Sequence, residues 1–583
     1  MSKKTFIFTL FALLGLATQM HAQDDMLSTP LTIEAVVNGN ITIDNKANGD
    51  IFYRIDNGDE NTVAGKSKQT INLSSGQKIQ FWGNNPRYYI KDYTNLKIKS
   101  QCYVYGNIMS LLSKDNFATM KTLTAENDSA FARLFQGNEE MMFHPSKKFL
   151  LPATTLSKGC YLSLFDKCKK GIKELPELPA TKLAYLCYSK MFKDCDALVE
   201  IPSLPDAEMA DGCYEEMFYG CDALVKAGSL PKSKPARLCY LGMFSNCKNL
   251  TVAPALPAMA LADSCYMSMF SGCTSLTKAP ELPATELAKG CYAMMFINCK
   301  GLTEAPVLPA TKLALLCYYK MFLNCTSLTK APELPATVLE GGCYENMFDG
   351  CISLIQAPEL SATELASGCY FWMFQNCTAL KVAPALPATT LASHCYTQMF
   401  YGCTSLVEAP DLPAMTLFDR CYDGMFAGCS SLIKAPVLPA LKLESGCYSG
   451  MFSGCSSLTK APELPAPKLE SECYRIMFYN CSLINELTCL ATDISAESCT
   501  SQWLFGVAET GTFHKAETMN DWVLNSDSGI PTGWTSVNVD TGVNDVKVDK
   551  KQLDGWTYTL GGQRATDSYK GVVIKDGHKV VVP

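Results

Sequence analysis

Cysteine is the residue whose number and spacing in this chain point most directly to chemistry. The 583-residue sequence has 29 cysteines, and from Cys160 onward thirteen of them begin a Cys-Tyr dipeptide that recurs first after 27 residues and then every 26. A second cysteine follows each of the thirteen after eight residues, a spacing unlike the close cysteine pairs of zinc sites. Disulfides between neighbouring turns remain geometrically allowed. We favour burial as small apolar side chains and predict that most thiols are free.

Histidines and carboxylates form no catalytic pattern in the sequence. After His21 there are four histidines, and none recurs in the repeat: His144, His394, His514 and His578. Four glutamates are separated by multiples of 26 residues, which favours a solvated face over paired catalytic carboxylates: Glu281, Glu333, Glu359 and Glu463. Metalloprotease, phosphate-loop and EF-hand motifs are absent. We therefore predict a protein that is not an enzyme and that binds no metal and no cofactor.

The apolar positions around each Cys-Tyr dipeptide predict a short helix. Counted from Leu287, the apolar residues lie at offsets 0, 4, 5, 8, 9 and 12, which matches helical periodicity. Thr285 occupies the expected N-cap position. Asn298, just before the second cysteine, is a residue type that commonly ends helices in the left-handed conformation. We expect one helix of about ten residues in each turn.

The other half of each turn predicts a brief strand. Leu276–Leu282 is too short for a helix, and Pro280 and Pro283 limit its hydrogen bonding. A strand of roughly three to four residues, followed by a helix and then by the next parallel strand, fits within 26 residues. The repeat therefore predicts an elongated solenoid rather than a single core.

The ends of the chain differ from the repeats. Lys3 and Lys4, an apolar run of about 11 residues and a small residue at Ala22 predict a secretory signal cleaved after Ala22, and that run is too short to span a membrane. The alternating segments after residue 31 predict a small antiparallel β domain. The expected division is 1–22 signal peptide, 23–105 N-terminal β domain, 106–159 N-terminal cap and first degenerate repeat, 160–498 repeat array, 499–540 C-terminal cap and 541–583 β-rich tail.

Two parts of the chain resemble known families. The pattern Phe-x-x-Cys-x-x-Leu, as in Phe296–Leu302 and Phe426–Leu432, resembles the BspA-like leucine-rich repeats of surface proteins from Gram-negative anaerobes. That resemblance implies an α/β leucine-rich-repeat solenoid with short parallel strands inside and short helices outside, although here the usual L-x-x-L-x-L strand is L-x-x-A-P-x-L. The tail, with Tyr558–Gln563 and two valine-rich segments, resembles type IX secretion sorting domains, which implies a location on or beyond the outer membrane.

These features together predict an exported protein that mediates adhesion or protein–protein interaction at the bacterial cell surface. The expected partner is a protein or glycan on host or neighbouring cells, with attachment to the outer-membrane surface through the tail. A net charge of −7 without a basic region argues against nucleic acid. The alternative is a glycan-capture component whose N-terminal domain binds carbohydrate through an aromatic cluster, Trp82, Tyr88, Tyr89 and Tyr93.

Variation within the otherwise uniform strand indicates where a partner would bind. Leu, Ala and Pro hardly change at the neighbouring positions, whereas the candidate positions change between Lys, Glu, Gln and Val. The candidate binding residues are Lys278, Glu281, Glu304, Lys330, Glu333, Gln356, Glu359, Glu408 and Asp411. The competing interpretation is a solubilising face with weak cross-strand ion pairs.

Overall fold

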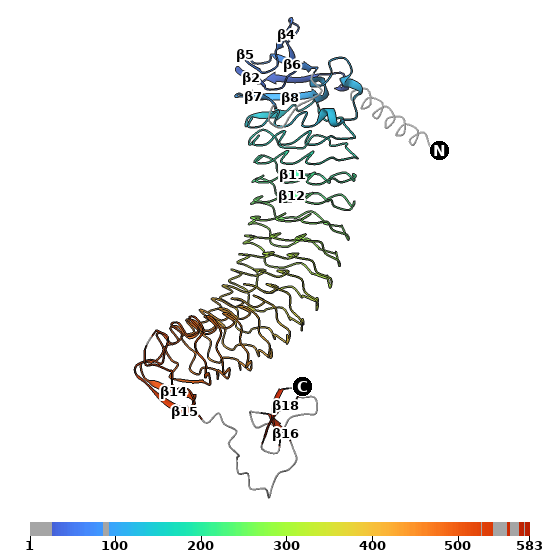
Figure 1. Ribbon diagram of the computed structural model, residues 1–583. Helices are drawn as coiled ribbons and strands as arrows, with labels where there is room; N and C mark the ends of the chain where they lie inside the picture. Colours follow the sequence, from blue (N-terminus) through green and yellow to red (C-terminus); the bar gives the residue numbers. More distant parts are fainter. Residues whose placement is uncertain are drawn as a thin grey trace, which may run out of the picture.

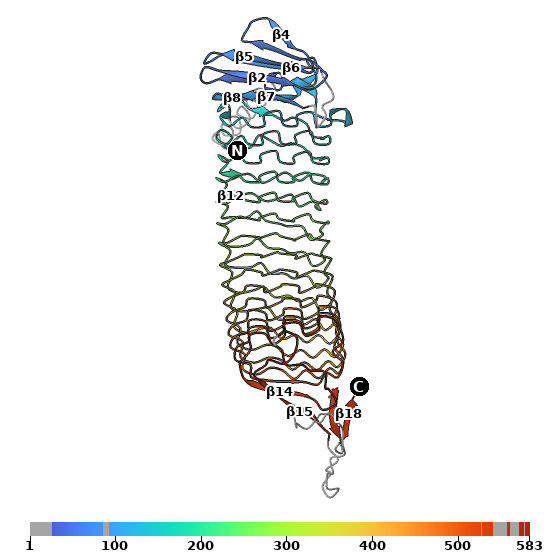
Figure 2. The same cartoon turned by 60° about the vertical axis from the view of Figure 1, so that its left-hand side comes forward.

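The computed structural model is a β-solenoid whose turns are about 26 residues long, as the sequence predicts (Figure 1). It describes residues 26–84, 93–525, 527–539, 557–559, 571–575 and 578–582, so the predicted signal peptide lies outside the described residues. A small β domain covers the N-terminal end of the stack, and the array bends in its C-terminal half (Figures 1 and 2).

The N-terminal domain is built from two sheets in which the domain's own strands pair antiparallel, in agreement with the alternating sequence. One sheet has the order β10-β8-β1-β6-β3-β4, and the other has the order β5-β2-β7. Their strands are β1 (Leu31–Ala35), β2 (Gly39–Asn45), β3 (Ile51–Ile55), β4 (Glu60–Val63), β5 (Ser67–Leu73), β6 (Lys78–Gly83), β7 (Thr94–Ile98) and β8 (Cys102–Asn107). Alternate residues are buried, such as Ile41 and Ile43 in β2.

This domain is continuous with the array. Strand β8 pairs in parallel with β9 (Met141–Phe143) and β10 (Phe149–Leu150), which belong to the first degenerate turns. Three short 3-10 helices connect them, η1 (Ile108–Leu111), η2 (Phe117–Thr119) and η3 (Ala125–Asn127). Because β8 belongs to both parts, the domain closes the N-terminal end of the solenoid core.

The predicted helix of each turn is wrong. The segment that begins just before the Cys-Tyr dipeptide, here called the turn segment (289–299 in one repeat), is a chain of consecutive turns. Its backbone is left-handed at Gly290, Met294 and Asn298, with φ of 57°, 59° and 59°. A left-handed residue every fourth position cannot occur within an α-helix. In the described repeats no α-helix is present.

Hydrogen bonds in the turn segment alternate between two kinds of acceptor. The Cys291 N–H donates to the Ala288 carbonyl within the turn at 3.2 Å, whereas the Tyr292 N–H donates to the Cys317 carbonyl of the next turn at 3.1 Å. Every second N–H therefore joins adjacent turns. The offsets 0, 4, 5, 8, 9 and 12 follow from this four-residue period, which over a dozen residues resembles the 3.6-residue period of a helix.

Stacked aromatic rings and buried thiols fill the interior behind the turn segments. Tyr292 stacks on Tyr318 with ring centroids 6.0 Å apart, and Phe296 stacks on Phe322 at 5.6 Å. The second cysteine of each turn donates its thiol to the phenylalanine carbonyl of the turn before, as Cys299 does to Phe270 at 3.0 Å. All 29 cysteines are unpaired and buried, which confirms the predicted free thiols. Cysteine thus acts here as a small apolar residue with one weak donor.

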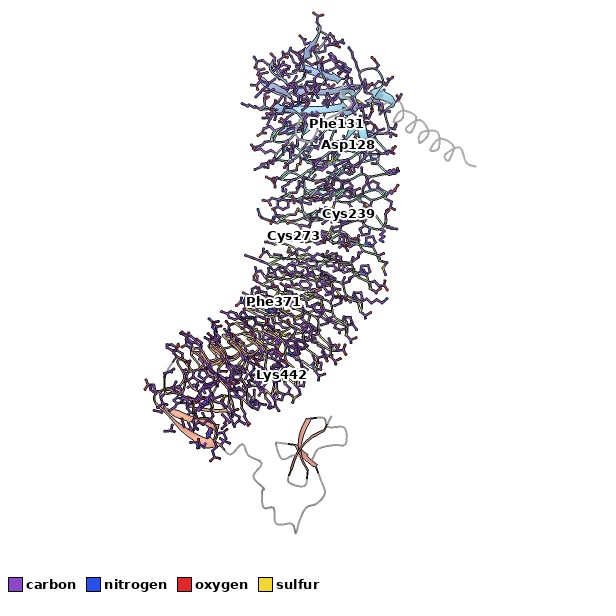
Figure 3. All side chains as sticks on the ribbon, in the orientation of Figure 1. Asp128, Phe131, Cys239, Cys273, Phe371 and Lys442 are labelled. Carbon is purple, nitrogen blue, oxygen red and sulfur yellow. The ribbon has the colours of Figure 1, made fainter. Side chains whose placement is uncertain are left out.

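The other half of each turn, here called the proline segment (276–288 in the same repeat), pairs only briefly with its neighbours. Single parallel bridges such as Lys278↔Glu304 and Lys330↔Gln356 replace longer strands, which confirms the short parallel pairing predicted from the prolines. Named strands in this region are β11 (Glu200–Ile201) and β12 (Lys226–Ala227). Figure 3 shows Phe371, from a turn segment, near the inner side of the bend and Lys442, from a proline segment, near its outer side.

Parallel strands close the C-terminal end of the array. They are β13 (Glu486–Cys489), β14 (Gly511–Ala516) and β15 (Trp534–Val539), paired in that order. Three antiparallel strands lie within the predicted tail, β16 (Thr557–Thr559), β17 (Gly571–Lys575) and β18 (His578–Val582). The segment between β15 and β16 lies outside the described residues.

Candidate interaction surface

The nine predicted binding residues lie on the proline segments, and all nine side chains are exposed. They form two rows that run along the array. The first row contains the bridge positions Lys278, Glu304, Lys330, Gln356 and Glu408, and the second contains Glu281, Glu333, Glu359 and Asp411, three residues further on in the sequence. Their exposure agrees with the inference that packing does not dictate their identity.

Four of the nine residues are brought together around one hollow. Lys330, Glu333, Gln356 and Glu359 line a depression of about 370 Å³ between two successive turns. Ser361 also lines it, at the position where the neighbouring turns carry Pro335 and Pro387. A hydroxyl group therefore replaces a proline ring at this place, and the hollow presents a cation, two carboxylates, an amide and a hydroxyl.

The other predicted residues do not join this hollow. Lys278, Glu281 and Glu304 belong to earlier turns, and Glu408 and Asp411 belong to a later one. The Glu408 carboxylate lies 4.0 Å from the Lys434 ammonium. Such exposed pairs contribute little to stability, so they agree equally well with the solubilising interpretation of the row.

The histidines lie in separate surroundings. His394 lies 3.5 Å from Asp419 and His514 lies 3.0 Å from Glu486, while the side chain of His578 lies outside the described residues. His144 accepts backbone N–H groups at Nδ1 and packs edge-on against Tyr105. No group of three potential metal ligands occurs in the part of the chain that the structure describes.

The aromatic cluster expected in the N-terminal domain is engaged by the protein's own cations. The Arg54 guanidinium lies over the Trp82 ring at 5.5 Å. Lys46 and Arg133 lie 4.7 Å and 5.0 Å from the Tyr93 ring. Tyr88 and Tyr89 lie outside the described residues. The two rings that are described are thus covered in part by neighbouring side chains rather than presented as a flat platform.

Sequence reasoning missed a second variable surface, on the turn segments. The two residues that follow each Cys-Tyr dipeptide, here called the outward pair, lie between the buried Tyr and the buried Met-Phe; the large members, such as Phe371 and Trp372, are half-buried, and small ones, such as Ser449, are buried. The pair is Tyr319–Lys320 in one turn, Phe371–Trp372 two turns later and Ser449–Gly450 further on. The variability that singled out the proline segment is equally visible here. It was overlooked because a helix was expected, and exposed helix positions vary widely.

Comparison with known proteins does not assign this arrangement to a family. No protein-family model, curated protein or solved structure matches the chain. Among the residues that the structure describes, no helix has the length and apolar character needed to cross a membrane.

Proposed function

We propose that this protein is an exported, non-enzymatic repeat protein that mediates adhesion or protein–protein interaction at the bacterial cell surface. Residues 1–22 would direct export and 541–583 would attach the protein to the outer membrane. The resemblance of the repeats to BspA-like leucine-rich repeats belongs to the same proposal. The expected partner is a protein or glycan on host or neighbouring cells.

The observation that carries the proposal is the ladder of variable, exposed polar residues on a long and uniform scaffold. A solenoid presents an extended surface to which successive turns contribute equivalent positions. At the hollow lined by Lys330, Glu333, Gln356 and Glu359 that ladder departs from flatness, and Ser361 there replaces a proline. Buried residues repeat almost unchanged along the array, so the exposed ones are free to be selected for a ligand.

The test is charge reversal on the ladder in the full-length protein. We would print extracellular-matrix proteins and a panel of host and bacterial glycans, and compare binding by the wild type, by the double variant Lys278→Glu/Lys330→Glu and by the control Lys434→Glu. The double variant should bind at least about tenfold more weakly, since like-charge contacts replace attractive ones. Thermal unfolding of all three proteins should coincide, because these side chains are exposed.

Unimpaired binding by the double variant would remove the ladder as the binding surface. Binding to glycans alone, unaffected by either substitution, would favour the N-terminal domain and the glycan-capture alternative. Retention of the protein inside the cell after deletion of 541–583, but not after deletion within the array, is expected if the tail directs attachment.

A further inference from the structure

The turn segments carry a group of aromatic and acidic side chains on consecutive turns. Tyr319, Glu345 and Phe371 are equivalent members of three successive outward pairs, and Trp372 completes the third pair. Asp349 lies four residues after Glu345, in the next outward position. These five residues, Tyr319, Glu345, Asp349, Phe371 and Trp372, are called the turn-face patch. Figure 3 shows Phe371 near the inner side of the bend.

The backbone ladder holds the patch residues next to one another. The Lys320 N–H donates to the Glu345 carbonyl at 2.9 Å, and the Asn346 N–H donates to the Phe371 carbonyl at 2.8 Å. The Phe371 and Trp372 rings stack with centroids 4.6 Å apart. Half-buried aromatic rings therefore lie on both sides of the Glu345 position along the array.

Local stability does not explain Trp372. Its backbone is left-handed, with φ of 57°, at a position where some turns carry glycine, such as Gly450, and most carry a side chain, such as Met294 or Ile476. A side chain at this φ costs roughly 1 kcal/mol relative to glycine. The Trp372 Nε1 group is also buried without an acceptor among the described residues, which is a further cost. The buried Nε1 group without an acceptor therefore gives Trp372 no advantage for folding over the smaller side chains of other turns.

The two carboxylates of the patch have Lys320 as a neighbouring cation, but neither forms an ion pair with it. Burial raises the pKa of the Glu345 carboxyl, and the charge of Lys320 only partly opposes this shift. Burial likewise raises the pKa of Asp349, against hydrogen bonds from Asn346 and Asn376. Within the described ranges, no Lys, Arg or His nitrogen lies within 4.0 Å of either carboxylate, the limit for an ion pair. A carboxylate that is partly desolvated and unpaired favours the approach of a cation.

An earlier part of the same face combines a cation, a carboxylate and an aromatic ring. The Lys193 ammonium lies 2.6 Å from the Glu216 carboxylate and 4.1 Å from the centre of the Tyr219 ring. Six turns later, the equivalent positions of Lys193 and Glu216 carry Asp349 and Trp372. An acidic side chain thus stands at the basic position there, and an aromatic one stands at the acidic position.

We propose that the turn-face patch binds a lysine or arginine side chain of a protein partner. The ring faces of Phe371 and Trp372 would hold the cation and its aliphatic stem, and Glu345 and Asp349 would neutralise its charge. Tyr319 already carries the Lys320 ammonium 4.8 Å from its ring centre, so cations do approach rings on this face. This inference rests on the proposed function in treating the array as a protein-binding surface, but it uses a different face.

The test is selection of peptides from a random twelve-residue phage library on the full-length wild-type protein. Peptides that bind should be enriched in lysine or arginine. The variant Phe371→Ser/Trp372→Gly copies the natural pair Ser449–Gly450, and the control Leu241→Ser creates the same pair outside the patch. The patch variant should bind the selected peptides at least about tenfold more weakly, and the control should bind within about twofold of the wild type.

Two further measurements keep the proposal specific. Replacing the basic residue of a selected peptide by citrulline or norleucine should weaken binding about fivefold or more, and Glu345→Gln should weaken the unmodified peptide to a similar degree. Selected peptides without basic residues, or equal binding by the patch variant and the control, would overturn the proposal. Failure to select any peptide, together with glycan binding that the patch variant loses, would assign the patch to carbohydrate instead.

The proposed function and this inference fail in different ways. Loss of partner binding in Lys278→Glu/Lys330→Glu with normal peptide binding supports the ladder and leaves the patch independent of it. Loss of peptide binding in the patch variant with an unaffected ladder assigns protein recognition to the turn face. Thermal unfolding of the patch variant should match that of the control, because both copy a pair that the array already uses.

Discussion

The two halves of each turn follow opposite rules. In the turn segment every second N–H bonds to the next turn, the aromatic rings stack and the buried residues hardly change. In the proline segment single bridges join the turns, and the exposed residues vary. Hydrogen bonding between turns is therefore concentrated on one side of the solenoid. A repeat of this kind can vary its solvent-facing residues on both halves because the bonds and stacked rings of the turn segment fix the stacking.

Raising the pH should affect the turn segments most strongly. Burial raises the pKa of the Cys299 thiol from its ordinary value of 9.0 to about 12, and Cys403 is raised to about 12 in the same way. Below pH 9 both the folded and the unfolded chain keep these protons. Between about pH 9 and 12 only the unfolded chain releases them, so each thiol lowers the stability by about 1.4 kcal/mol per pH unit.

With two such thiols per turn, the array should unfold cooperatively soon above pH 9. Circular dichroism and the absorbance of tyrosinate, recorded under reducing conditions, should change together because the stacked tyrosines ionise only on unfolding. The N-terminal domain should be destabilised much less over this pH range, since Cys102 is its single cysteine. Gradual ionisation of thiols in a folded array would contradict the buried placement.

The next largest effect should come from a single core ring. Phe374 is fully buried and stacks on Phe348 and Phe400 at 5.6 Å on each side. Phe374→Ala should cost about 3 to 5 kcal/mol through lost burial and an unfilled cavity. Hydrogen exchange should show loosening that is greatest in the adjacent turns, since each turn contacts only its neighbours. Uniform loosening from residue 130 to 535 would argue against this independence.

A glycine substitution separates the observed turns from the expected helix. Gly450 has φ of 58°, and an added Cβ would meet nothing closer than Ile476 at 3.5 Å, so space is sufficient. Gly450→Ala should therefore destabilise the array by about 1 kcal/mol for conformational reasons alone. In a helix the same change would stabilise by about 1 kcal/mol. Chemical denaturation of the wild type and the variant gives the sign of the change in unfolding free energy. A more stable variant would support the predicted helix instead of the observed turns.

The sequence allowed the repeat length, the buried positions and the free thiols to be predicted, but not the local backbone. Asn298 was expected to be left-handed, and it is. Gly290 and Met294 adopt the same conformation. Methionine is not a residue type that indicates a left-handed backbone, and at Met294 this conformation is held by the hydrogen bond from its N–H to the Tyr319 carbonyl. That bond depends on a residue 25 positions away, so local periodicity cannot reveal it.

The candidate surface was predictable to the same extent. Sequence variation between turns was enough to predict that Lys330 and Gln356 are exposed, because it requires only that equivalent positions be compared. The hollow between them depends on Ser361, whose departure from proline is visible in the sequence but whose effect requires two stacked turns. The lack of an ion pair at Glu345 is harder still to predict from the sequence, because it depends on which cations the neighbouring turns supply.

The smallest effect should follow substitution in the proline segment. Lys330 is exposed and forms no ion pair within 4.0 Å in the described part of the chain, and its backbone bridge to Gln356 does not involve its side chain. Lys330→Glu should therefore change the free energy of unfolding by no more than about 0.5 kcal/mol, the usual range for surface substitutions.

Asn376→Ala is the matched change in the turn segment, because Asn376 is also exposed but has a left-handed φ of 57° and donates to Asp349. If exposure alone decided tolerance, the two variants would unfold at the same denaturant concentration. A distinctly lower midpoint for Asn376→Ala is expected, because alanine adopts the left-handed conformation of this position less readily than asparagine does.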